Sequence, residues 1–209
     1  VDDDGTGGQG TRLNIALGGA PNNLDVVVNT ADLVHVIAYG SIFEQLVALD
    51  GNSEPVPELC THWEISDDAK DYTYYLRKGV KFHNGEEMKA ADVVASTNRW
   101  IDVAGSAGDL VGGAHFYEVD DYTVEITMEQ GTPYLNLMIG GLGQHPSVMP
   151  AAIVEAAGTE GIIDEYIGTG PYKFDKWEED QYVRLVKNED YQHYGPPGDY
   201  SGWAGYKSA

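Results

Sequence analysis

The chain has 209 residues, of which 12 are basic and 34 are acidic, so its formal net charge is −22. This length accommodates one or two domains with a core of useful size. The negative field repels phosphates and anionic lipid headgroups, which argues against nucleic acid and membrane surfaces as direct partners. The acidity is typical of a solvated surface, and adaptation to high salt is the sharper alternative.

Both the beginning of the chain and its single cysteine are informative. Residues 1–10 are polar and glycine-rich and are predicted to be a flexible tether, such as remains after a secretion signal is removed or left out. No run of 18 apolar residues occurs, which argues against a membrane span. Cys60 has no partner for an internal disulfide and is predicted to be a small buried hydrophobe.

The first predicted elements are a strand and a long helix. Residues 13–17 alternate apolar and polar side chains, as a strand does. From Thr30, the predicted N-cap, apolar residues recur every three to four positions as far as Val47 and indicate a helix. A turn is predicted at Gly51 and Asn52, and a short strand at residues 80–82.

The rest of the chain predicts three hairpins and three helices. The hairpins turn at 66–70, 120–121 and 178–180, each between segments of alternating apolar residues. One helix carries Val93 to Ile101, and two others begin with Pro133 and Pro150 at the first helical position, the second ending at Gly158. Beyond Tyr191 no apolar period remains, which we interpret as a truncation. The pattern predicts a mixed α/β fold.

Nothing in the pattern predicts catalysis, a metal site or a cofactor. The six histidines have no ligand spacing, and residues 168–171 lack the Lys-Ser/Thr of a phosphate-binding loop. Acidic pairs at 67–68 and 120–121 fall in hairpin turns, where turn chemistry explains them. A secreted hydrolase, the third hypothesis, needs a convergent carboxylate pair such as one including Asp67 or Asp68.

Three ordered stretches carry a resemblance to a known family. The first comprises IFEQLV at 42–47, EPVPEL at 54–59 and WEISDD at 63–68; the second comprises YTYYLRKGVKFHNG at 72–85 and AADVVAS at 90–96. The third comprises IGTGPY at 167–172, Trp177 and NEDY at 188–191. Together they resemble the family 5 extracellular solute-binding proteins, which include dipeptide-, oligopeptide- and nickel-binding proteins. One departure is Lys89, which stands where relatives have a capping Thr, so either the cap comes from elsewhere or Asp92 compensates through the helix dipole.

The resemblance implies a periplasmic-binding-protein-like class II fold with two lobes that close on a ligand. In the first lobe, residues 11–41 and 166–209 would form a discontinuous base domain, and residues 42–165 an inserted domain. The second lobe would follow Ala209, outside the chain. Residues 168–171 would shape the return from the inserted domain to the base domain without touching ligand.

The resemblance also implies half of a ligand site. Its expected residues are the loop and helix start Asn29, Thr30, Ala31 and Asp32, with Phe116 and Tyr117 as an apolar wall. Free helix N–H groups at the loop suit a ligand carbonyl or carboxylate, although Thr30 could equally cap its own helix. Trp100 is expected in the core rather than in that wall.

The function implied is the substrate-binding component of an ABC importer, a monomer without cofactor that delivers a peptide or similar small solute to permease subunits. It would act outside the membrane, extracellular or periplasmic, as a lipoprotein; nickel chelates and oligosaccharides remain alternative ligands. A different hypothesis is a stand-alone adhesion module whose contact surface would be Tyr191, Tyr194, Tyr200, Trp203 and Tyr206.

Overall fold

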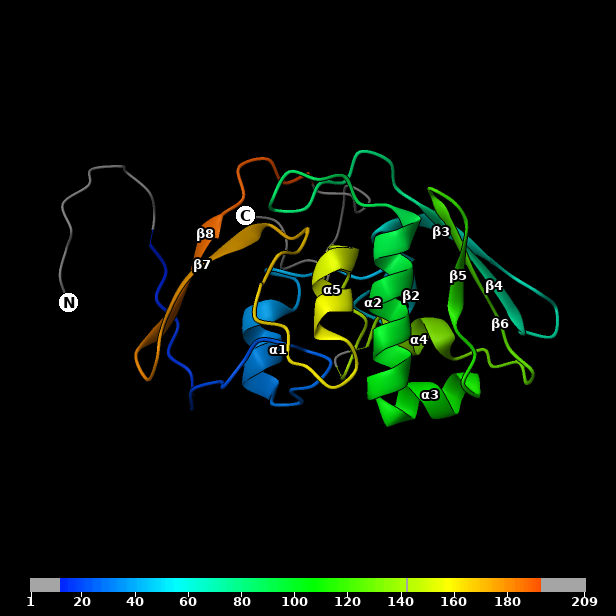
Figure 1. Ribbon diagram of the computed structural model, residues 1–209, viewed down its shortest axis with the longest axis horizontal. Coiled ribbons are helices and arrows are strands. Elements are labelled where there is room, and N and C mark those ends of the chain that lie inside the picture. Colours follow the sequence, from blue (N-terminus) through cyan, green and yellow to red (C-terminus); the bar gives the residue numbers. More distant parts are fainter. Residues whose placement is uncertain (1–11, 142, 193–209) are drawn as a thin grey trace.

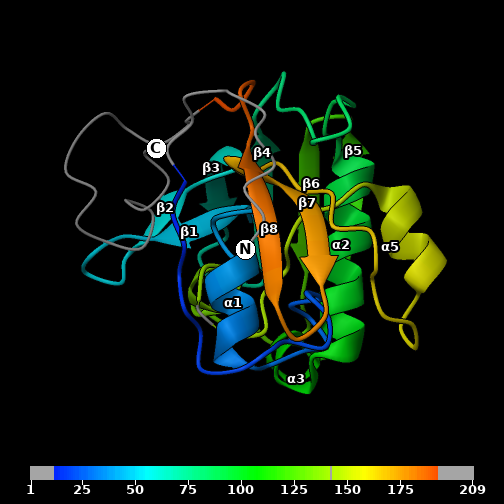
Figure 2. The ribbon, with the colours of Figure 1, turned by 90° about the vertical axis from the view of Figure 1, so that its left-hand side faces the viewer.

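The computed structural model describes residues 12–141 and 143–192, which form a mixed α/β fold. Helix α1 (Asp32–Ala38) and the hairpin β7–β8 (Tyr172–Glu178 and Tyr182–Lys187) lie toward one end of the molecule, and a four-stranded sheet lies at the other (Figure 1). Figure 2, seen from the hairpin side, places α1 and β8 in front of the sheet. No helix in the described part of the chain is long and apolar enough to cross a membrane.

Two hairpins build the antiparallel sheet, whose strand order is β3-β4-β6-β5. They are β3 (Cys60–Ile65) with β4 (Asp71–Leu76), and β5 (Phe116–Asp120) with β6 (Thr123–Thr127). Tyr72 and Tyr74 on β4 point into the core, where their hydroxyls donate to Thr132 O and Asn136 Oδ1, both at 2.6 Å. These bonds satisfy the polar ends of two large buried rings.

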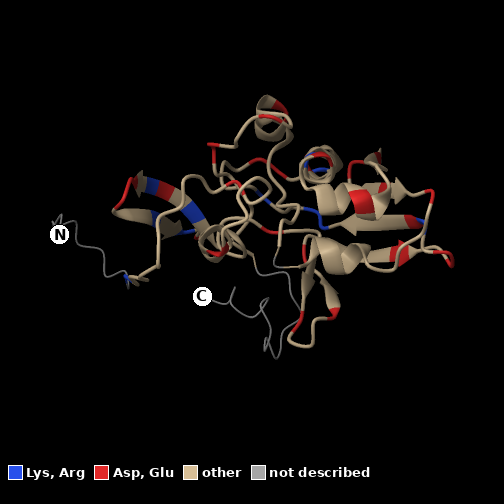
Figure 3. Cartoon of the chain, turned by 90° about the horizontal axis from the view of Figure 1, so that it is seen from below, with Lys and Arg blue, Asp and Glu red and all other residues tan. Residues whose placement is uncertain are grey.

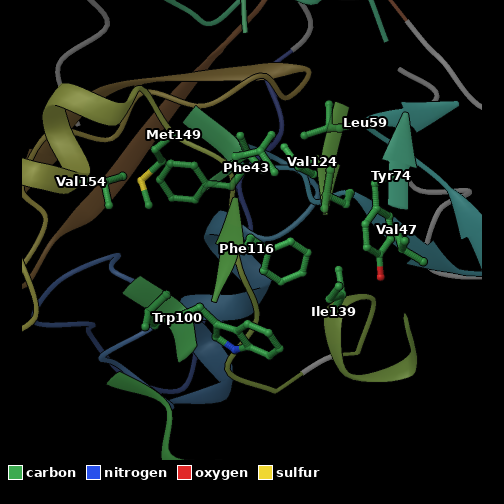
Figure 4. Close-up of a cluster of buried hydrophobic side chains, with 14 of the residues drawn as sticks. Phe43, Val47, Leu59, Tyr74, Trp100, Phe116, Val124, Ile139, Met149 and Val154 are labelled. Atoms are coloured by element: carbon green, nitrogen blue, oxygen red, sulfur yellow. The ribbon is translucent and has the colours of Figure 1, made fainter. Parts of the chain in front are cut away.

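Helix α2 (Ala90–Val103) covers this sheet and also packs against α3 (Gly105–Val111) and α5 (Ala151–Ala157). Trp100 on α2 is fully buried, as predicted, and Figure 4 shows it near Phe116 in the core. The small strands β1 (Val47–Leu49) and β2 (Pro55–Pro57) pair across the predicted turn, and α4 (Leu135–Ile139) packs on β1.

Asp92 settles the open question about the start of α2. Its Oδ2 accepts from the backbone N–H of Lys89 at 2.8 Å, and its Oδ1 accepts from Ala151 N at 2.8 Å. One carboxylate therefore satisfies free N–H groups at the starts of both α2 and α5.

Several local predictions need correction. Residues 13–17 form no strand and are exposed, because no described segment pairs with them and a strand needs a partner for its backbone groups. The helix predicted from Thr30 to Val47 is only α1, since Gly40 adopts φ 66° and Val47 belongs to β1. Ala31, and not Thr30, is its N-cap.

Smaller differences concern the short strand and the prolines. Residues 80–82 contribute only an isolated bridge, Lys81 to Glu87. Pro150 is the N-cap of α5 rather than its first residue, and α4 begins two residues after Pro133. The Gly158 C-cap and all three hairpin turns are confirmed. The tether at residues 1–10 lies outside the described residues.

Candidate functional site

The loop before α1 is organised around one buried carboxylate, that of Asp25. The side chain of Asp25 is 0% exposed, and it accepts from Val27 N and Ile163 N, both at 3.1 Å. Its backbone carbonyl accepts from Asn29 N at 2.8 Å. These bonds fix the path of residues 25–29 and so determine where the following exposed residues lie.

Arg99 on α2 neutralises this carboxylate. Its Nη2 lies 2.7 Å and its Nη1 3.2 Å from the two Asp25 oxygens, a bidentate arrangement. The remaining donors reach the carbonyls of Gly158 at 2.7 Å and Gly161 at 3.0 Å. Because the Arg99 side chain is only 4% exposed, the pair forms a buried joint between the loop, α2 and the segment after α5.

The predicted ligand residues Asn29, Thr30, Ala31 and Asp32 lie together at the end of this loop. Asn29 is half-buried and donates to Asn22 Oδ1 at 2.7 Å, while its own Oδ1 accepts from Ala31 N at 3.1 Å. Thr30, Ala31 and Asp32 are exposed, and α1 has no side-chain cap. The alternative role for Thr30, capping its own helix, is therefore wrong.

Phe116 and Tyr117 do not lie with the loop. The Phe116 ring is 2% exposed and packs on Tyr74 at a centroid distance of 5.9 Å, inside the core shown in Figure 4. A ring buried between sheet and helix offers no surface to a solute, so its prediction as a cleft wall is corrected. Tyr117 is exposed on β5 and donates to Glu125 Oε2 at 2.8 Å. Figure 1 places β5 at the end of the molecule away from α1.

The three sequence motifs converge at a crossing of two backbone segments. Gly170 N donates to Ile42 O at 3.0 Å, and Thr169 Oγ1 donates to the buried carboxylate of Glu44 at 2.7 Å. His83 Nε2 lies 2.9 Å from Gly170 O. Ile42, Glu44 and His83 are far from residues 168–171 in the sequence, so residues 168–171 join distant segments of the chain. Their role in the return between two domains stays a prediction.

Glycine is required at this crossing because the segments approach closely. A Cβ on Gly168 would lie 2.1 Å from Ile42 O, and one on Gly170 would lie 2.3 Å from Ser41 O. The imidazole of His83 accepts from Gly168 N through Nδ1 at 3.3 Å. Burial is the main cause that lowers the pKa of His83, which favours the neutral form that this bond requires.

A shallow hollow of about 220 Å³ adjoins the crossing. Its lining is mostly aromatic and apolar with one ammonium group, from His83, Asn84, Tyr166, Ile167, Lys173 and Phe174. The Tyr166 hydroxyl accepts from Leu24 N at 3.2 Å, which ties the hollow to the loop before α1. Sites for drug-sized ligands are usually about 300–1,000 Å³, so this hollow alone is small for a peptide.

Charge is distributed unevenly over the described residues. Acidic side chains are spread over loops, helices and strands, and the hairpin β7–β8 carries basic bands interleaved with acidic ones (Figure 3). The basic bands contain Lys173, Lys176, Arg184 and Lys187. A ligand at the α1 loop would therefore approach a surface with both signs of charge nearby.

The described residues give little support to a metal site, a reactive cysteine or a catalytic pair of carboxylates. They contain no group of three or more His, Cys, Asp or Glu placed to hold a metal ion. Cys60 is buried as predicted, and burial raises the pKa of its thiol to about 12, which suppresses the reactive thiolate. Asp68 stays at an exposed turn, where its Oδ1 accepts from Ser66 Oγ at 2.9 Å.

The proposed aromatic contact surface of an adhesion module is only partly visible. Tyr191 donates its hydroxyl to the buried Glu44 at 2.9 Å, so its polar end is used inside the fold. The other four residues of that surface, Tyr194, Tyr200, Trp203 and Tyr206, lie outside the described residues. The same holds for residues 193–209 of the predicted base domain. The boundaries predicted at 41/42 and 165/166 remain predictions.

Comparison with known proteins decides the family. Residues 54–200 match the family described as bacterial extracellular solute-binding proteins, family 5, middle region. The chain belongs to this family. It is 29% identical to di/tripeptide-binding protein 4 of Pseudomonas aeruginosa over 91% of this chain and 40% of that protein.

Two solved structures of binding proteins have a fold similar to that of this chain. The ABC transporter-associated periplasmic binding protein DppA of Helicobacter pylori, in complex with the peptide STSA, matches 83% of this chain and 38% of its own with a TM-score of 0.67 and 29% identity. AgaA of Agrobacterium tumefaciens, in complex with agropinic acid, matches 83% of this chain and 35% of its own with a TM-score of 0.72 and 27% identity. The chain thus spans about 40% or less of the length of these relatives.

Proposed function

We propose that this protein is the substrate-binding component of an ABC importer, which captures a peptide or similar small solute outside the membrane and delivers it to permease subunits. The observation that carries the proposal is family membership over residues 54–200. Relatives are named for di- and tripeptides, and similar structures hold a peptide or agropinic acid. A peptide is therefore the first ligand to test, and another small polar solute is the second.

The share of the ligand site proposed for this chain is Asn29, Thr30, Ala31 and Asp32. These residues are polar or small and accessible, and Asp25 and Arg99 hold the backbone that leads to them. Rigid support reduces the entropy lost when a ligand binds. Tyr117 is left out because β5 lies away from the loop (Figure 1).

The rest of the site is proposed to come from a second lobe outside these 209 residues. Two observations support this: the chain spans about 40% or less of its relatives, and the hollow at the crossing has only about 220 Å³. An open half-site loses the burial and water exclusion that closure supplies, so its affinity falls steeply.

Calorimetry with a panel of di- and tripeptides tests both parts of the proposal. We expect binding to the product of the complete reading frame and weak or no binding to the 209 residues alone. Tight binding by the 209 residues alone would contradict the half-site. Failure of every peptide and small polar solute to bind the complete product would contradict the function.

A matched pair of variants tests the loop. In the complete product, Asp32→Asn is expected to weaken ligand binding about tenfold or more, because a hydrogen bond to a charged group contributes roughly 1.5–3 kcal/mol. Asp109→Asn makes the same charge change at an exposed position on α3 and should leave affinity unchanged. Equal affinities for the two variants would remove Asp32 from the site.

The description of the family as extracellular supports an action outside the cytoplasm. We further propose a monomer without catalytic activity that is attached to the outer face of the membrane as a lipoprotein. Incorporation of labelled palmitate into the protein in its host tests the anchor, and sedimentation at micromolar concentration tests the monomer. An unlabelled, dimeric protein would contradict both.

A further inference from the structure

A cluster of buried polar atoms without hydrogen-bond partners lies beside the proposed site, between α1 and the segment that precedes α5. Among the described residues these atoms are His35 Nε2, His145 Nε2 and Ser147 Oγ, and the buried Gln45 amide beside them makes a side-chain hydrogen bond with Tyr39. All four residues are at most 7% exposed. We call these four residues, together with Tyr39, the polar cluster.

Side-chain contacts bring the polar cluster together. The rings of His35 and His145 have centroids 5.4 Å apart, and Tyr39 meets His145 edge-on at 4.6 Å. Burial raises the pKa of Tyr39 to about 12, and its hydrogen bond with the Gln45 side chain opposes that rise. Ser147 N donates to His145 O at 3.0 Å. Residues separated by up to 112 positions in sequence thus share one buried region.

Backbone carbonyls determine the tautomers of the two histidines. His145 Nδ1 lies 2.7 Å from Gly143 O, and His35 Nδ1 lies 3.2 Å from Ala31 O. A carbonyl only accepts, so each Nδ1 carries the hydrogen, and in the neutral ring Nε2 then presents a lone pair. Burial lowers the pKa of His145 to about 3, so its ring is neutral near pH 7. Two neighbouring acceptors cannot bond to each other and need a donor between them.

Water is the donor that fits best. Leaving the three atoms His35 Nε2, His145 Nε2 and Ser147 Oγ unpaired would cost roughly 3–9 kcal/mol, a large share of the net stability of a domain. Folded proteins contain on the order of one buried water per 27 residues, each with about three hydrogen bonds to polar groups that lack other partners. A divalent metal ion fits poorly, because the cluster offers no carboxylate or thiolate to balance a buried charge.

We propose that the polar cluster is a buried water site. At least one water donates its two hydrogens to His35 Nε2 and His145 Nε2 and accepts from Gln45 Nε2 or Ser147 Oγ. It joins α1 to residues 143–148 by hydrogen bonds that the side chains do not make directly. If the proposed function holds, this water also steadies the helix that directly follows the ligand loop at 29–32.

A crystal structure of the protein at about 1.8 Å or better tests the proposal independently of any ligand. We expect a density peak roughly 2.7–3.2 Å from both Nε2 atoms. A cluster with no peak, whose side chains rotate to bond each other, would overturn the proposal. So would a peak with an anomalous signal at about 2.0–2.1 Å from the two nitrogens, which would be a transition metal.

A pair of variants gives a second readout in solution. Gln45→Met keeps the side-chain length but removes both amide atoms, so a bound water loses partners and the melting temperature should fall by roughly 2–4 °C. Gln181→Met makes the same change at an exposed turn and should leave it unchanged. An unchanged or higher melting temperature for Gln45→Met would show that the amide supports no bound water and would overturn the proposal.

Discussion

Removing one partner of the buried ion pair between Asp25 and Arg99 is expected to destabilise the fold strongly. In Asp25→Asn the guanidinium stays 4% exposed and loses its counter-charge, although Gly158 O and Gly161 O still accept from it. Breaking a buried pair from one side typically costs about 3–5 kcal/mol. Domains have a net stability of roughly 5–15 kcal/mol, so replacing one carboxylate oxygen of Asp25 by an amide nitrogen removes a large share of that stability.

Urea unfolding followed by tryptophan fluorescence measures the effect, and a double-mutant cycle isolates the pair. We expect Asp25→Asn and Arg99→Leu each to lower the free energy of unfolding by about 3–5 kcal/mol, and the double variant to lose much less than their sum. Glu189→Gln disrupts an exposed pair at 3.3 Å with Lys187 and should change stability by less than about 1 kcal/mol. Additive losses, or single losses as small as the control, would refute the view that this pair holds the loop.

Two further predictions concern the crossing and the polar cluster. Gly170→Ala should cost about 1–3 kcal/mol because its Cβ would meet Ser41 O at 2.3 Å. Gly105→Ala, in open space at a helix start, should be neutral or stabilising, and equal effects in chemical unfolding would contradict the close approach. Burial lowers the pKa of His145 from 6.5 to about 3, so the unfolded chain binds a proton more readily than the folded one. The contribution of His145 to the free energy of unfolding is therefore complete above about pH 6.5 and is lost toward pH 3 at about 1.4 kcal/mol per pH unit. His145→Gln should flatten the slope of the free energy of unfolding against pH between about pH 6 and 4. An unchanged slope for His145→Gln would show that the ring is not held neutral by burial.

Sequence alone was sufficient for elements whose signal is local. Each of the three hairpins combines alternating apolar residues with a polar turn, and the structure confirms them all. Helix α2 shows an apolar face at a spacing of three to four, and Trp100 on that face is in the core. The order and spacing of the motifs were enough to identify the family, because each motif consists of residues that are close together in the sequence.

Local signals failed where another segment decides the outcome. The alternation at 13–17 resembles a strand, but no described strand pairs with it. The apolar spacing after Thr30 continues past α1, yet Gly40 turns the backbone and Val47 pairs with Pro57 instead. Tertiary pairing outweighs weak local propensity.

The candidate site depends on contacts that no local pattern contains. Asp25 and Arg99 are 74 residues apart and look like ordinary charged residues in the sequence, but burial makes each necessary to the other. His35 and His145 show no ligand spacing along the chain and become neighbours only after folding. The sequence by itself determined the three hairpins, helix α2 and the family. The tertiary structure decided which charges are buried together and which residues remain accessible, because burial depends on segments that the chain brings together from a distance.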